Sequence, residues 1–213
     1  WDQFEKNSNK KFKVKLVKEK LNIDSLKHET VNFLNWFSEY NLVPIGMALK
    51  LHLLKGNAIL KHKNSEYQKY KIKNNKQKYH LSDEQEIVFK ELVKYDNSFR
   101  VHLLQGTTGS GKTIVYFKAI EKIIHQAKQS LILLPEIGLT GEFEKKFKNF
   151  FGFEAAVWHS KITPKRKKII WSGLASGEIK VVIGARSALF LPFKKLGLIV
   201  VDEEHDQSFK QDE

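Results

Sequence analysis

A glycine-rich stretch near the middle of the chain has the residue types and spacing needed to bind a phosphate chain. It reads Gly-Thr-Thr-Gly-Ser-Gly-Lys-Thr and fits the pattern G-x-x-x-x-G-K-[ST]. Glycines let the backbone curl so that its N–H groups point at phosphate oxygens, and a following helix adds partial positive charge. We expect Lys112 to reach the β- and γ-phosphates of ATP and the Thr113 hydroxyl to bind Mg²⁺. The candidate ATP-binding residues of this loop are Gly106, Thr107, Thr108, Gly109, Ser110, Gly111, Lys112 and Thr113.

An acidic tetrad forms the second candidate site, roughly 90 residues further along the chain. Four apolar residues, Leu198–Val201, come directly before Asp202-Glu203-Glu204-His205. A carboxylate at the end of a strand, facing the glycine-rich loop, can hold Mg²⁺ through water, which is the role we predict for Asp202. The neighbouring Glu203 can act as a general base on the attacking water, and His205 completes the predicted nucleotide-binding set. An acidic surface turn is the alternative for the tetrad considered alone.

Alternating strand and helix patterns surround both motifs. Residues 100–105 before the glycine-rich loop read as a short buried strand, and residues 114–127 after it read as a helix. Four more apolar stretches with little alternation, each followed by a helix signal or a loop, predict further buried strands: 130–134, 154–158, 180–184 and 198–201. This order predicts an α/β fold with a doubly wound parallel sheet, whose ligands lie at the carboxyl ends of the strands.

Gln85 lies near the start of a helix that we expect to run from about residue 82 to Tyr95. Ser82 and Gln85 have the spacing of a capping box, so Gln85 can cap the helix. Its amide both donates and accepts hydrogen bonds, so it can also read the edge of adenine. The two roles do not exclude each other.

The N-terminal third of the chain is strongly basic. Residues 1–80 carry a net charge of +10 from 17 basic and seven acidic residues, out of +13 for all 213 residues. A polyanion such as nucleic acid is one partner that this charge suits, and lysine-rich solvated faces are the alternative. We divide the chain into a partial N-terminal domain (1–57), a basic linker (58–80) and a nucleotide-binding lobe (81–213).

The N-terminal piece contains a predicted strand at residues 12–17, a helix at 28–40 and a second helix from near Pro44 to Gly56. The aromatic residues of the first helix are interpreted as core rather than as a platform for stacking bases. The piece is too short for a large core, so we expect it to pack on a neighbour. Residues 61–79 interleave lysines with Tyr67, Tyr70 and Tyr79, which is typical either of a solvated linker or of a segment that follows a nucleic-acid strand.

Composition limits the remaining possibilities. The chain has no cysteine, so it contains no disulfide and no thiolate metal site, which agrees with a cytoplasmic location. No apolar run reaches the length of a membrane span, and no signal-peptide pattern opens the chain, so we expect no membrane partner. The first residue is Trp1 and the last is Glu213, so we expect the chain to be part of a larger protein.

The motifs in this order resemble the first motor lobe of a superfamily 2 helicase. The glycine-rich loop is followed by Leu-Leu-Pro-Glu-Ile-Gly-Leu-Thr, His-Ser, Gly-Ala-Arg-Ser-Ala-Leu-Phe and Asp-Glu-Glu-His. The family that these segments resemble most is that of the primosomal replication-restart DNA helicases, over nearly all of residues 81–213. Residues 32–46 are similar to the end of that family's N-terminal DNA-binding domain.

This resemblance implies a RecA-like fold and ATP-driven 3′→5′ movement on single-stranded and forked DNA, with other replication-restart proteins as partners. It implies that Gln85 reads adenine, and that the residues facing DNA are Thr140, Arg186, Ser187, Phe209 and Lys210. Arg186 next to a hydroxyl also suits a phosphate clamp on chemical grounds, and a salt bridge within the lobe is its alternative.

The chain departs from the family pattern in two places. Too few residues separate the N-terminal piece from the motor for the winged-helix domain that the family has there. The family's cysteine zinc site and second motor lobe follow the acidic motif, so we expect zinc only in a downstream region. Because that second lobe carries an arginine of the ATP site, we expect this chain alone to hydrolyse ATP poorly. The rival interpretations are another superfamily 2 motor, such as an RNA helicase or restriction translocase, and a non-enzymatic nucleic-acid-binding module.

Overall fold

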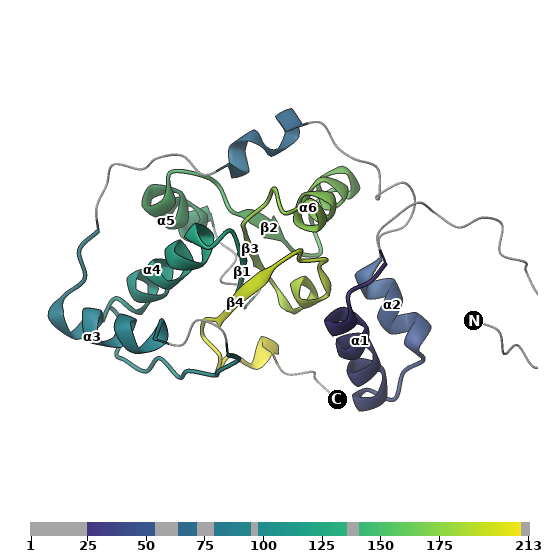
Figure 1. Ribbon diagram of the computed structural model, residues 1–213, viewed down its shortest axis with the longest axis horizontal. Coiled ribbons are helices and arrows are strands. Elements are labelled where there is room, and N and C mark those ends of the chain that lie inside the picture. Colours follow the sequence, from purple (N-terminus) through teal and green to yellow (C-terminus); the bar gives the residue numbers. More distant parts are fainter. Residues whose placement is uncertain (1–24, 54–63, 72–78, 95–97, 136–140, 210–213) are drawn as a thin grey trace, which may run out of the picture.

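A sheet of four parallel strands forms the centre of the molecule (Figure 1). The computed structural model describes residues 25–53, 64–71, 79–94, 98–135 and 141–209. The strands lie in the order β2-β3-β1-β4. Their bounds are β1 Gln129–Leu133, β2 Ala156–Trp158, β3 Val181–Gly184 and β4 Leu196–Val201. These are the four strands that the apolar stretches after the glycine-rich loop predict.

Helices cover both faces of this sheet, because alternate residues of the strands point to opposite sides. Leu131 and Leu133 of β1 belong to a buried cluster with α6, while Ile132 of β1 belongs to a second cluster with α4 and α5. Figure 1 accordingly shows α4 and α5 on one side of the sheet and α6 on the other. The predicted doubly wound α/β fold is therefore confirmed. The helices of this lobe are α3 Asp83–Leu92, α4 Lys112–His125, α5 Gly141–Phe151 and α6 Pro164–Ser176.

Local signals in the sequence set where two of these helices begin. Ser82 caps α3, accepting from the Gln85 backbone N–H, while the Gln85 side chain accepts from the Ser82 backbone N–H, so the predicted capping box is confirmed. Thr163 caps α6 by accepting from the Arg166 backbone N–H, with Pro164 in the first turn. No helix among the described residues is both long and apolar enough to cross a membrane.

The strand predicted at residues 100–105 is wrong. This segment has no regular structure, and two of its apolar side chains are open to solvent, with Val101 84% and Leu103 79% exposed. A parallel strand needs a neighbour to bond to, and the sheet ends at β4, with no described strand beyond it. The apolar sequence therefore has strand character without the partner that would make it a strand.

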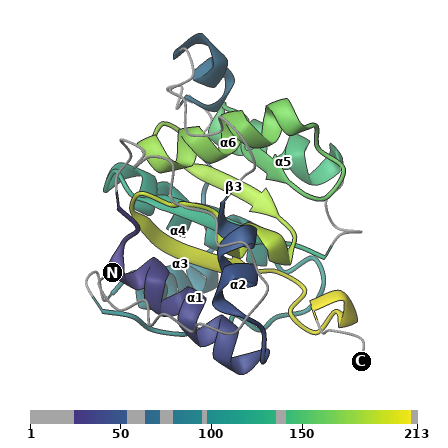
Figure 2. The same ribbon diagram turned by 90° about the vertical axis from the view of Figure 1, so that its right-hand side faces the viewer.

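Two helices from the N-terminal piece pack beside the sheet, α1 (His28–Tyr40) and α2 (Ile45–His52) (Figure 2). The first was predicted from helical spacing and the second from Pro44 and Gly56 as its start and stop, and α2 ends at His52, before the predicted stop. The strand predicted at residues 12–17 lies outside the described residues. Phe33 and Phe37 of α1 contact Phe190 of the lobe, with ring centroids 5.4 and 4.9 Å away. His52 of α2 bonds through Nδ1 to the Phe190 carbonyl at 2.8 Å. The helix pair thus packs on a neighbour, as expected.

The aromatic residues of α1 divide between core and surface. Phe33 and Phe37 are partly buried against the small cluster that contains Leu34, whereas Trp36 and Tyr40 are exposed and stack on each other with centroids 5.3 Å apart. The prediction that the aromatic residues of this helix belong to the core holds for the two phenylalanines and is wrong for Trp36 and Tyr40.

Part of the predicted basic linker belongs to the core. Residues Asn64–Tyr70 form a 3₁₀ helix, and Tyr67 and Tyr70 are only 3% and 2% exposed. Both rings lie in the cluster between α6 and the sheet, and the Tyr67 hydroxyl donates to Ser172 of α6 at 3.3 Å. These two tyrosines therefore neither belong to a solvated linker nor stand free to stack on bases.

Candidate nucleotide-binding site

The glycine-rich loop between the segment at 99–105 and α4 depends on its three glycines. Gly109 and Gly111 have φ angles of +83° and +82°, in the left-handed region that side chains disfavour. At Gly106 a Cβ atom would lie 2.7 Å from the Ser110 hydroxyl oxygen, so the Ser110 side chain would have to move. The curled shape predicted for a phosphate-binding loop is thus the one that these residues adopt.

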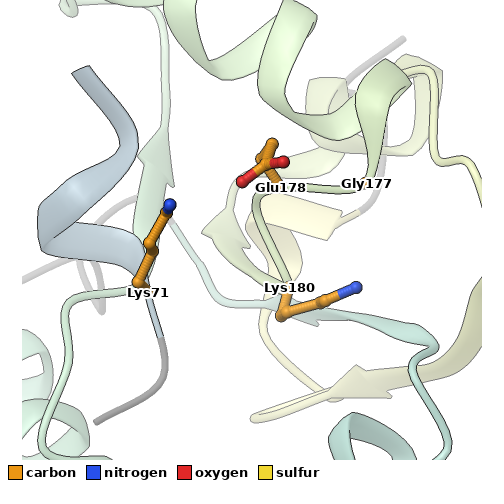
Figure 3. Close-up of a pocket in the computed structure, with 4 residues that line it drawn as sticks. All are labelled: Lys71, Gly177, Glu178 and Lys180. Atoms are coloured by element: carbon orange, nitrogen blue, oxygen red, sulfur yellow. The ribbon is translucent and has the colours of Figure 1, made fainter. Parts of the chain in front are cut away.

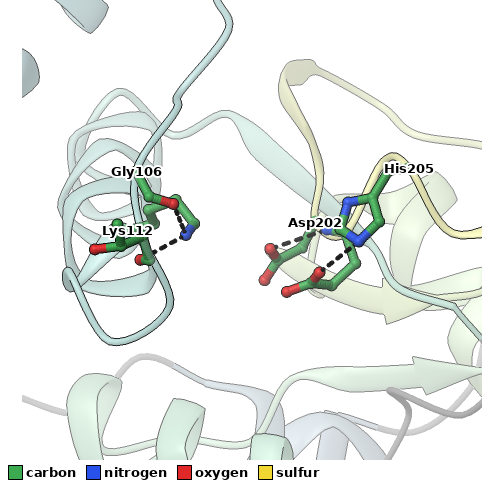
Figure 4. Close-up of polar contacts among 6 residues, drawn as sticks. Gly106, Lys112, Asp202 and His205 are labelled. Carbon is green, nitrogen blue, oxygen red and sulfur yellow. Dashed lines mark hydrogen bonds and ion pairs between the residues drawn. The ribbon is translucent and has the colours of Figure 1, made fainter.

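Lys112 begins α4 and folds back over the loop. Its ammonium donates to the backbone carbonyls of Gly106 at 2.7 Å and Thr107 at 3.1 Å (Figure 4). Thr107 and Thr108 are exposed beside it. The loop therefore places a positive charge and a helix N-terminus together, an arrangement that favours an anion.

Asp202 follows β4 directly, and both oxygens of its carboxylate are held. Its backbone N–H donates to the Leu133 carbonyl at 3.0 Å, which extends the pairing of β4 with β1. Its Oδ1 accepts from the Glu203 backbone N–H at 3.1 Å, and its Oδ2 accepts from the Tyr116 hydroxyl at 2.8 Å. Since Tyr116 lies on α4, this last bond ties the acidic motif to the helix that starts with Lys112.

Tyr116 is buried between the two motifs, and its surroundings keep it protonated. Burial raises the pKa of the Tyr116 phenol far above its ordinary value, and the negative charge of Asp202 raises it further. The nearby Thr113 side chain acts in the opposite direction and lowers the pKa of this phenol. Tyr116 was not identified from the sequence. Its spacing of three residues from Thr113 indicates only that the two side chains share one face of α4.

Glu203 adopts an unusual backbone conformation for a residue with a side chain. Its φ angle is +52°, and its carbonyl accepts from the Asp206 N–H at 2.9 Å, which closes a tight turn. Such strain is often found at functional positions. The exposed Glu203 carboxylate lies 3.4 Å from His205 Nε2, so these two predicted residues lie together at the end of β4 (Figure 4).

Gln85 links the start of α3 to the glycine-rich loop. While its Oε1 takes part in the capping box, its Nε2 donates to the Ser110 carbonyl at 3.1 Å. A Cβ atom at Gly111 would lie 2.4 Å from that Nε2, so the glycine also makes room for this contact. The amide thus supports the loop, and its reading of adenine stays a prediction.

Two of the residues predicted to face nucleic acid meet away from the loop. Arg186, which follows β3, donates from its guanidinium to the Phe209 carbonyl at 3.4 Å, and Ser187 is exposed beside it. The Phe209 ring packs against the cluster between α6 and the sheet. Thr140 and Lys210 lie outside the described residues.

Two further observations concern a possible metal site and a surface hollow. Within the described part of the chain, no group of three or more His, Cys, Asp or Glu side chains is arranged to hold a metal ion. A surface hollow is lined by Lys71, Gly177, Glu178 and Lys180 (Figure 3). Because Lys180 precedes β3, this hollow lies at the amino ends of the strands, the opposite edge of the sheet from the predicted site.

Residues 57–212 match the family described as type III restriction enzyme, res subunit. The chain belongs to this family. It is a helicase family, and the four-stranded parallel sheet with its helices agrees with a RecA-like lobe.

Curated relatives of this family member carry the name replication restart protein PriA. The protein from Rickettsia felis is 42% identical over 202 residues, which cover 94% of this chain and 30% of the relative. The one from Bacillus subtilis is 43% identical over 135 residues (62% of this chain, 17% of the relative). The one from Helicobacter pylori is 49% identical over 130 residues (61% of this chain, 20% of the relative). The chain thus spans at most about a third of these relatives, and it resembles the part that contains their first motor lobe.

Proposed function

We propose that this chain is the ATP-binding lobe of a DNA helicase that acts in replication restart. Its similarity to proteins named for replication restart, together with a helicase family that covers residues 57–212, supports this proposal over an unrelated motor. The observation that carries it is that helix α4 contacts both the glycine-rich loop and the acidic motif. This helix begins with Lys112 and Thr113, and its Tyr116 donates to Asp202, so both predicted halves of the site adjoin one helix end.

The residues present fit a magnesium–nucleotide. Gly109 and Gly111 have the left-handed backbone of a curled loop, and the Lys112 ammonium lies at the loop. The hydroxyl of Thr113 and the carboxylate of Asp202 are the oxygen ligands that Mg²⁺ prefers. When bound, Mg²⁺ neutralises negative charge on the β- and γ-phosphates.

Each protein group then has a role. Lys112 and the loop N–H groups bind and orient the phosphates, while Glu203 accepts a proton from the attacking water. Arg186 and Ser187 contact the backbone of single-stranded or forked DNA, and other replication-restart proteins are partners. The 3′→5′ direction, the cytoplasmic location and slow hydrolysis by the chain alone are expectations from the resemblance.

A nucleotide titration tests the central claim. Binding of a fluorescent ATP analogue with Mg²⁺ is measured for the wild type and for Lys112→Ala. Loss of a charged hydrogen-bond donor is worth about 1.5–3 kcal/mol, so affinity should fall roughly tenfold or more. Lys118→Ala is the matched control, because Lys118 lies on the same helix and pairs with Glu121 rather than with the loop.

Equal affinity of the wild type and Lys112→Ala would refute nucleotide binding at this loop and favour a non-enzymatic basic module. The choice of nucleic acid is tested separately, by competition between single-stranded DNA and RNA of the same sequence. A clear preference for RNA would refute the DNA assignment and favour another helicase of the superfamily.

A further inference from the structure

Tyr116 occupies a position between the two motifs that a residue serving only the core would not need. It is 5% exposed, and its ring packs edge-to-face on Phe117 with centroids 5.3 Å apart. Its hydroxyl nevertheless points out of this cluster, to the Asp202 carboxylate at 2.8 Å. The ring therefore belongs to the core, while the hydroxyl belongs to the site.

The carboxylate of Asp202 is fixed from two sides by this arrangement. The Glu203 N–H holds Oδ1 at 3.1 Å and the Tyr116 hydroxyl holds Oδ2, so rotation of the carboxylate would break at least one bond. A phenol has a single proton to donate, and here an ionised acceptor takes it, which makes a strong hydrogen bond. Because Thr113 and Tyr116 are three residues apart on α4, the same phenol lies on the helix face that carries the Thr113 hydroxyl.

We propose that Tyr116 is a positioning residue for Mg²⁺: its hydroxyl holds Asp202 beside Thr113, so that two oxygen ligands are oriented before the metal–nucleotide binds. This inference rests on the proposed function, since it assigns a role within the same site. Groups that orient metal ligands commonly change metal affinity by about 10- to 100-fold when they are removed. The alternative is a buried tyrosine whose hydroxyl merely finds an acceptor.

The test separates the metal from the nucleotide. Tyr116→Phe removes the hydroxyl and keeps the ring, so the packing on Phe117 survives. Binding of a fluorescent ATP analogue is measured once in EDTA and once as Mg²⁺ is titrated at fixed nucleotide. We expect the Mg²⁺ concentration at half-saturation to rise about tenfold, with the metal-free affinity unchanged within about twofold.

A matched control exists on the other face of the sheet. Tyr67 is 3% exposed and also donates its hydroxyl to one side chain, Ser172 at 3.3 Å. Tyr67→Phe therefore deletes the hydroxyl of a similarly buried tyrosine that belongs to the other core cluster, and it should leave the Mg²⁺ half-saturation unchanged. In an Asp202→Ala background, Tyr116→Phe should cause no further change, because the group that it positions is gone.

Three results would overturn the proposal: a Tyr116→Phe variant that responds to Mg²⁺ like Tyr67→Phe, an equal loss of affinity with and without metal, or a full effect in the Asp202→Ala background. The Lys112→Ala variant keeps this failure distinct from failure of the proposed function. If Lys112→Ala weakens binding and Tyr116→Phe leaves the metal dependence unchanged, only the role of Tyr116 is refuted. If Lys112→Ala binds as the wild type does, the nucleotide site itself is refuted.

Discussion

Gln129, at the start of β1, joins three segments of the chain by one buried amide. The side chain is 1% exposed. Its Nε2 donates to the carbonyls of Leu174 at 3.1 Å and Ile179 at 2.7 Å, and its Oε1 accepts from the Lys195 N–H at 2.9 Å. These partners lie at the end of α6, before β3 and before β4. Gln129 therefore fastens the amino ends of the strands, at the edge of the sheet opposite the acidic motif.

Replacing Gln129 with methionine keeps the length of the side chain and removes all three hydrogen bonds. The Lys195 N–H and the Ile179 carbonyl are then left without partners, whereas the Leu174 carbonyl keeps its bond from the Gly177 N–H at 3.1 Å. Each buried group left without a partner costs about 1–3 kcal/mol. The greater burial of apolar atoms offsets part of this, so we expect the free energy of unfolding to fall by about 3 kcal/mol. That is a large share of the roughly 5–15 kcal/mol by which such domains are stable.

Urea unfolding followed by far-ultraviolet circular dichroism measures this loss. With a slope of about 2 kcal/mol per molar urea, the midpoint should fall by about 1.5 M. Ser130→Ala is the control, because Ser130 is also fully buried while its hydroxyl has no hydrogen-bond partner among the described residues. Its stability should stay unchanged or rise by about 1 kcal/mol. A loss below about 1 kcal/mol for Gln129→Met would refute the reasoning from buried hydrogen bonds.

Two further predictions concern the acidic motif and the packing of the helix pair. Glu203→Gln should keep nucleotide affinity and remove any ATP hydrolysis, since the amide cannot accept the proton of water. Hydrolysis is measured by phosphate release, and surviving hydrolysis would exclude Glu203 as the base. Burial lowers the pKa of His52 below its usual 6.5, although its hydrogen bond to the Phe190 carbonyl opposes this. The unfolded chain therefore takes up the proton first, so stability is fully present above about pH 6.5 and falls as the pH drops below it. Urea midpoints at pH 7.5 and 5.5 should differ less in His52→Gln than in the wild type, and an equal difference would contradict this assignment.

Much of the lobe could be predicted from local signals. The four paired strands are short apolar runs, and both α3 and α6 begin at a side-chain cap that the sequence shows. The positive φ angles at Gly109 and Gly111 follow from a motif that requires a curled backbone. These features depend on residues within a few positions of each other, which is why the sequence alone reveals them.

The features that were missed depend on contacts between distant segments. Residues 100–105 have the composition of a strand, yet a strand forms only where a neighbour supplies hydrogen bonds. Tyr67 and Tyr70 lie in a lysine-rich stretch that reads as solvated, and only the surface of α6 shows that a hydrophobic place is available for them. The bond from Tyr116 to Asp202 spans 86 positions of the chain, and no local pattern indicates it.

The outer side of β4 has a consequence for any experiment on this chain. Within the described part of the chain its backbone bonds to β1 on one side and to no strand on the other, and Leu196, Ile199 and Val201 are all partly open to solvent. An exposed edge strand of this kind is a template to which strands of other molecules can add. Self-association should therefore grow with protein concentration, and affinities measured on dilute samples will describe the monomer most faithfully.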